Sequence, residues 1–138
     1  AFVPHAVSAH FPNALLPTAA LFWLLYFVSN KASFESTLFY LLVIIMLTSP
    51  ITFATGFLDW RKKYSGELTP IFRKKIALGI ALVVIGLVAV LWRMINPEVL
   101  SSGGFSACAF SILLFIMLGC VTLLGHYGGM LVFSKRKE

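Results

Sequence analysis

The chain has 138 residues, of which 59% are hydrophobic and only 12% charged, and its mean hydropathy is +0.94. Soluble domains usually carry about 25% charged residues and about 45–50% apolar residues. This chain therefore has too few polar side chains to cover a water-soluble globule. The composition excludes that class and indicates an integral membrane protein.

Four apolar segments follow one another along the chain, over about residues 3–29, 36–60, 70–95 and 105–133. A helix of about 20 apolar residues crosses the hydrocarbon core of a bilayer. The connections between the segments are short and leave little chain for a soluble domain. We therefore predict that residues 1–138 form a single all-α domain, a bundle of four transmembrane helices.

The basic residues indicate how this bundle is oriented. Nine of the eleven Lys and Arg residues lie in two groups, residues 61–75 and 135–137, and only Lys31 and Arg93 lie at the opposite helix ends. With four spans, the middle connection and both termini share one side. The positive-inside rule predicts that this side, with both termini, is cytoplasmic, as in a bacterial inner membrane. The net charge of +6 is thus explained by topology and lipid phosphates, and no nucleic-acid partner is expected.

Helix-breaking residues mark the expected boundaries. Asn30 ends the first helix, and Asn96 with the following proline ends the third. Gly103 and Gly104 precede the fourth helix. In the second helix, Pro50 removes a backbone donor near mid-membrane and predicts a kink.

Three ionisable side chains are expected at one depth. His10 lies 20 residues before Asn30, His126 lies 21 after Phe105, and Asp59 lies 22 after Thr37. At 1.5 Å per residue, each is about 30–33 Å from the periplasmic side. Ionisable groups within spans usually face the bundle interior and mark function. The alternative, stronger for His5 at about 7 Å further out, is that headgroup water solvates the imidazoles.

Two further features lie at this level. Lys74 and Lys75 belong to a basic cluster at the start of the third helix, and could neutralise the propionates of a haem. Gly125 and Gly129 flank His126 in a GxxxG pair, which allows a second backbone to approach closely. The same glycines could also make room for a porphyrin ring. The sequence leaves both explanations open.

Three motifs resemble an uncharacterised family of predicted four-helix bacterial membrane proteins. His5-Ala6-Val7-Ser8-Ala9-His10-Phe11-Pro12 resembles the family's opening His-Pro-x-x-Val-His-Phe-Pro, with Ala6 and Ala9 as departures. Thr55-Gly56-Phe57-Leu58-Asp59 resembles its Thr-Gly-x-x-Asp, and residues 125–132 resemble its Gly-His-x-Gly-Gly-x-Leu-Val. The resemblance implies no settled activity. It implies a setting near cytochrome c and other respiratory components.

Several functions remain open. We expect a small electron-transfer subunit of a respiratory or photosynthetic redox complex, binding haem b through His10 and His126 or lining a quinone site, with Asp59 bonded to a ligand histidine. A non-catalytic accessory subunit beside a larger complex is the alternative. A Zn or Fe site built from His5, His10 and His126, with Asp59 as a further ligand, is a third possibility. Transport is weaker, because no charged residue is expected at mid-membrane. No catalytic residues are expected, since the sequence shows no nucleophile–base set, phosphate loop or paired carboxylates, and a stand-alone enzyme is not expected.

Overall fold

The computed structural model describes residues 4–63 and 70–136, and the side chains of residues 10–62 and 70–127. This part of the chain is helical, in the order α1 (Pro4–Ser29), α2 (Ala32–Lys63), α3 (Pro70–Ile95) and α4 (Gly104–Arg136). All four helices are long and apolar enough to cross a membrane. The predicted four-helix membrane bundle is confirmed.

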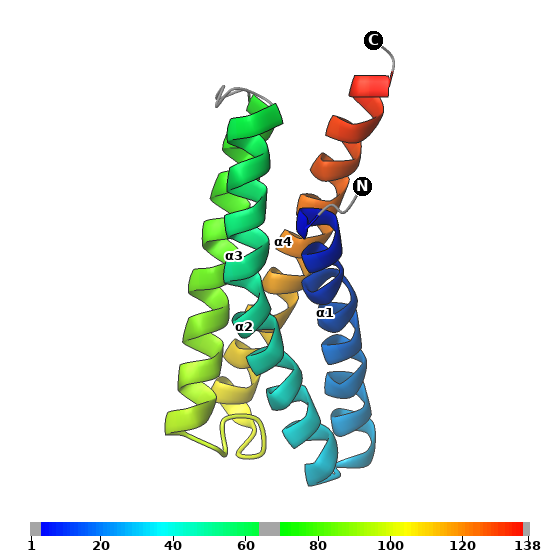
Figure 1. Ribbon diagram of the computed structural model, residues 1–138. Coiled ribbons are helices and arrows are strands. Elements are labelled where there is room, and N and C mark those ends of the chain that lie inside the picture. Colours follow the sequence, from blue (N-terminus) through cyan, green and yellow to red (C-terminus); the bar gives the residue numbers. More distant parts are fainter. Residues whose placement is uncertain (1–3, 64–69, 137–138) are drawn as a thin grey trace.

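The helices form an up-and-down bundle in which α1 packs on α2, α2 on α3, α3 on α4, and α4 on α1. Figure 1 shows the first turn of α1, the end of α2, the start of α3 and the last turns of α4 toward one end, which we call the terminal end. The α1–α2 and α3–α4 connections lie together at the other end, the loop end. This is the arrangement that four spans with short connections require.

The helix boundaries largely match the expected breaks. Asn30 has a left-handed φ of 56°, and its amide donates to the Tyr26 carbonyl at 2.7 Å, which ends α1 as a C-terminal cap. α3 ends at Ile95, directly before Asn96. α2 differs, because it begins at Ala32, four residues before the predicted start, and continues through Pro50 to a length of 32 residues.

Hydroxyl groups accompany the proline in α2. The Ser49 hydroxyl is buried and donates to the Ile45 carbonyl at 2.6 Å, and the Thr48 hydroxyl donates to the Ile44 carbonyl at 3.0 Å. Such bonds help a membrane helix to keep its backbone polar groups satisfied around a proline. Figure 1 shows α2 leaning away from α1 in its second half and running beside α3.

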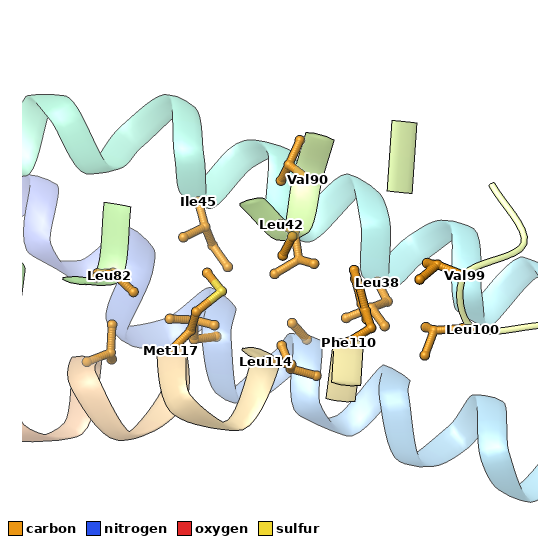
Figure 2. Packing of buried hydrophobic residues seen from close by; sticks show 14 of the residues in the cluster. Leu38, Leu42, Ile45, Leu82, Val90, Val99, Leu100, Phe110, Leu114 and Met117 are labelled. Carbon is orange, nitrogen blue, oxygen red and sulfur yellow. The ribbon is translucent and has the colours of Figure 1, made fainter. Parts of the chain in front are cut away.

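The core consists of aliphatic and aromatic side chains at helical spacing. Its fully buried members include Leu38, Leu42 and Ile45 of α2 and Phe110, Leu114 and Met117 of α4. These positions are four and three residues apart, so they form one stripe on each helix. Figure 2 shows the two stripes pointing toward one another across the middle of the bundle.

Glycines let α2 and α3 approach closely. Gly79 and Gly86 lie two turns apart on α3, and both are buried. A methyl group on Gly79 would overlap the ring of Phe53, and one on Gly86 would overlap the end of the Met46 side chain. Small residues at helix contacts are the usual solution in membranes, where dispersion contacts replace hydrophobic burial as the driving force.

Candidate functional site

The two histidines with described side chains lie on neighbouring helices, α1 and α4, toward the terminal end. The helices meet where a methyl group on Gly125 would lie 3.9 Å from Oδ1 of Asn13, an ordinary van der Waals contact. His10 precedes Asn13 by three residues, and His126 follows Gly125 by one. Since α1 and α4 are antiparallel, the two histidines differ in depth by only about 3 Å.

The glycine beside His126 has open surroundings. Gly125 is exposed, and a methyl group there would meet one atom outside its own helix within 4 Å, Oδ1 of Asn13 at 3.9 Å. The surroundings of Gly129 lie outside the described side chains. Close approach of a second helix and room for a ring therefore both stay predictions.

Both imidazoles lie on the surface, where the sequence had favoured the bundle interior. His10 and His126 are each exposed. The reason is their place near the end of the bundle, where interfacial water is available and the cost of exposing a polar ring is small. Any group that these histidines hold would therefore lie on the surface of the bundle.

A lysine and a tyrosine extend this region onto α3. The Lys74 ammonium lies 5.5 Å from the centroid of the Tyr127 ring, within the range of a cation–π contact. The Tyr127 and His126 rings are neighbours, with centroids 5.6 Å apart. Lys74 therefore contacts the residue next to His126, and its positive charge lies in the same region of the bundle.

Asp59 lies further along its helix than the residue count from Thr37 assumed. It is 27 residues beyond Ala32, about 40 Å along α2, whereas His10 is 19 residues, about 28 Å, from Ser29. Because α2 leans away from α1 in its second half (Figure 1), length along α2 does not give depth directly, and the common depth of Asp59 and the histidines stays a prediction. The Asp59 carboxylate interacts electrostatically with Lys75, which is half-buried at the start of α3.

The remaining predicted residues lie outside the described side chains. His5 belongs to α1 and Gly129 to α4, but their surroundings are not part of the description. Among residues 10–62 and 70–127, no three His, Cys, Asp or Glu side chains gather as metal ligands would. The metal site that includes His5 is thus not tested by this geometry.

A buried ion pair at the loop end was not foreseen. Arg93 donates from Nε to Oε1 of Glu35 at 2.5 Å and from Nη2 to Oε2 at 2.9 Å. The Arg93 and Glu35 side chains are only 15% and 10% exposed, and the guanidinium lies 4.7 Å from the Phe39 ring centroid. Glu35 is in the first turn of α2 and Arg93 in the last turn of α3, where each charge also complements its helix dipole. The signal was present in the sequence, because an acid and a base lie at the same end of consecutive spans.

The whole-chain comparison agrees with this architecture. The model of the family described as "Predicted membrane protein (DUF2231)" matches residues 4–137. A relative named only "Uncharacterized protein", from Archaeoglobus fulgidus, is 28% identical over 92 residues, which are 67% of this chain and 72% of that protein. No solved structure matches the chain. The chain belongs to the DUF2231 family of predicted membrane proteins.

Proposed function

We propose that this chain is a small membrane electron-transfer subunit that binds haem b through His10 and His126. The observation that carries the proposal is the placement of two accessible imidazoles on adjacent helices, about 3 Å apart in depth. Neutral imidazoles are the usual axial ligands of a b-type haem, and their environment sets its reduction potential. Lys74, which contacts Tyr127 next to His126, supplies a positive charge for a propionate.

Because the His10 and His126 rings are exposed, the proposal also requires a partner that covers the haem. The bundle itself does not enclose the imidazoles, so the haem would lie on the outer side of α1 and α4. Its remaining surface would then be covered by a larger membrane redox complex or by a cytochrome c. The nine-to-two distribution of basic residues supports a location at the cytoplasmic face of a bacterial inner membrane. A quinone beside the same histidines would meet the same polar groups.

The test is a haemin titration of the chain purified in mild detergent, followed by absorption spectra before and after dithionite. We expect one haem per chain with the spectrum of a six-coordinate, low-spin b-type haem. His10→Ala and His126→Ala should each remove this spectrum and leave the far-UV circular dichroism of a helical protein unchanged.

Matched controls exist on the same two helices. The Thr18 hydroxyl donates to the Ala14 carbonyl and the Thr122 hydroxyl to the Leu118 carbonyl, within their own helices. Thr18→Ala and Thr122→Ala should therefore bind haem as the unaltered chain does. If the unaltered chain takes up no haem, or if both histidine variants keep the low-spin spectrum, the proposal is wrong.

A non-catalytic accessory subunit is the second candidate. The exposure of His10 and His126 favours it, since surface imidazoles can donate hydrogen bonds to a neighbouring subunit as readily as they can ligate iron. In that case the histidine variants would weaken co-purification with the partner complex, and the chain alone would remain colourless.

A further inference from the structure

A groove runs along the outer side of α1 and α4 at the loop end, far from the histidines. Its volume is about 710 Å³, within the range of about 300–1,000 Å³ that is typical of ligand sites. The wall on α1 is formed by Trp23 and Phe27, and α4 contributes Ala107, Cys108, Ser111 and Phe115 among others. These residues belong to membrane-spanning parts of the two helices, so the groove opens toward lipid.

The shape of the groove follows from side-chain size. Ala107, Cys108 and Ser111 have small side chains, so the surface of α4 at these positions is lower than the aromatic rings around it. The Trp23 ring meets Phe115 edge-on with centroids 4.8 Å apart, and meets Phe27 at 4.9 Å. Aromatic contacts at these distances are favourable. They hold the walls in place and keep the hollow open.

The side-chain N–H and O–H donors of Trp23 and Ser111 are already used. The Trp23 indole N–H donates to Oγ of Ser111 at 2.7 Å, and the Ser111 hydroxyl donates to the Ala107 carbonyl at 2.8 Å. A tryptophan and a serine have one such donor each, and the Cys108 thiol is only a weak one. A polar ring with carbonyl oxygens, such as a quinone head, would therefore find no free N–H or O–H side-chain donor in the middle of the groove. The chemistry favours a wholly apolar occupant.

A cation lies at the loop end of the bundle, where lipid headgroups are expected. Lys31 is exposed and lies in the α1–α2 connection, two residues beyond the end of the helix that carries Trp23 and Phe27. Arg93, at the same end of the bundle, is held by Glu35. The charge of Lys31 can interact with a lipid phosphate. Each Lys or Arg near an anionic membrane surface contributes about 1 kcal/mol of attractive free energy.

We propose that the groove binds one acyl chain of an anionic phospholipid, with the phosphate of that lipid against Lys31. The acyl chain fills the hollow over Ala107 and Cys108 by dispersion contacts, and the charge selects the headgroup. The site is independent of the haem proposal, because it lies at the opposite end of the bundle and uses none of the same residues.

Trp23 provides the signal for a direct test, because bromine atoms on an acyl chain quench tryptophan fluorescence on contact. Trp60 and Trp92 are replaced by Phe so that Trp23 alone reports, and the protein is purified in detergent with its lipid removed. It is then titrated with phosphatidylglycerol carrying brominated chains, and separately with phosphatidylcholine carrying the same chains. We expect quenching that saturates at about one lipid per chain, with phosphatidylglycerol binding more tightly.

Four variants connect the quenching signal to the groove. Cys108 is exposed in the groove, so Cys108→Phe fills the hollow without entering the core and should weaken binding by at least about tenfold. Cys108→Leu should have a smaller effect in the same direction. Thr122→Phe places the same ring on an exposed position of α4 beyond the groove and should bind as the Trp23 reporter protein does. Lys31→Gln should remove the preference for phosphatidylglycerol.

Several results would overturn the proposal. Quenching that rises without saturation would mean that the lipid has no defined site. Equal binding by the Cys108→Phe and Thr122→Phe variants would place the lipid elsewhere. Displacement of the brominated lipid by a short-chain quinone, but not by unbrominated phosphatidylglycerol, would assign the groove to a quinone. A dimer by light scattering, with Trp23 protected from the lipid, would assign it to a second copy of the chain.

Discussion

Breaking the Glu35–Arg93 pair should destabilise the bundle through the charge that is left behind. Replacing Glu35 with Leu removes the acceptor of two charge-assisted hydrogen bonds, 2.5 and 2.9 Å long, and leaves a guanidinium that is only 15% exposed. Removing one partner of a buried pair costs about 3–5 kcal/mol. Arg93 is near the end of α3 and can turn toward the interface, so we expect the lower part of this range, about 3 kcal/mol.

The variant with both residues replaced gives the more specific prediction for stability. With Glu35→Leu and Arg93→Met together, no charge remains buried, and replacement of a buried pair by apolar groups is often neutral or stabilising. We therefore expect the double variant to be within about 1 kcal/mol of the unaltered chain and clearly more stable than Glu35→Leu alone.

The assay is a double-mutant cycle by reversible unfolding in detergent micelles, with helix content followed by circular dichroism. Glu98→Ala is the control, because Glu98 is an exposed acid at the same end of the bundle, and surface substitutions change stability by no more than about 0.5 kcal/mol. The reasoning is refuted if the double variant loses the sum of the two single losses, since the pair would then contribute no coupling energy.

Three further outcomes are expected. Gly79→Leu should destabilise the chain by about 1–3 kcal/mol in the same unfolding assay, because its side chain meets the Phe53 ring where even a methyl group has no room. Gly119→Ala should be neutral or stabilising by up to about 1 kcal/mol, because a methyl group there meets nothing within 4 Å and alanine favours helix; a larger loss than at Gly79 would contradict the packing described. Reporter fusions after Asn30 and after Lys137 should report opposite sides of the membrane, and a signal from one side for both would contradict the four-span topology.

The sequence alone was sufficient for the architecture. An apolar segment long enough to cross the bilayer must form a helix, because its backbone polar groups find no hydrogen-bond partners in lipid and must pair within the helix. Four such lengths with short connections allow little besides an up-and-down bundle. The boundary at Asn30 was also predictable, since asparagine adopts the left-handed conformation that ends a helix. The basic residues predicted the orientation, which the structure does not test.

Only the tertiary structure decided which side chains meet. Glu35 and Arg93 are 58 residues apart, and their contact depends on the rotation of α2 and α3 about their axes, which depth counting does not provide. The rotation of α1 and α4 about their own axes places His10 and His126 on the surface, which depth counting likewise does not provide. The early start of α2 also places Asp59 further along its helix than the residue count from Thr37 assumed. Counting residues along a helix gives a position along that helix, whereas the direction of a side chain is determined by packing against its neighbours.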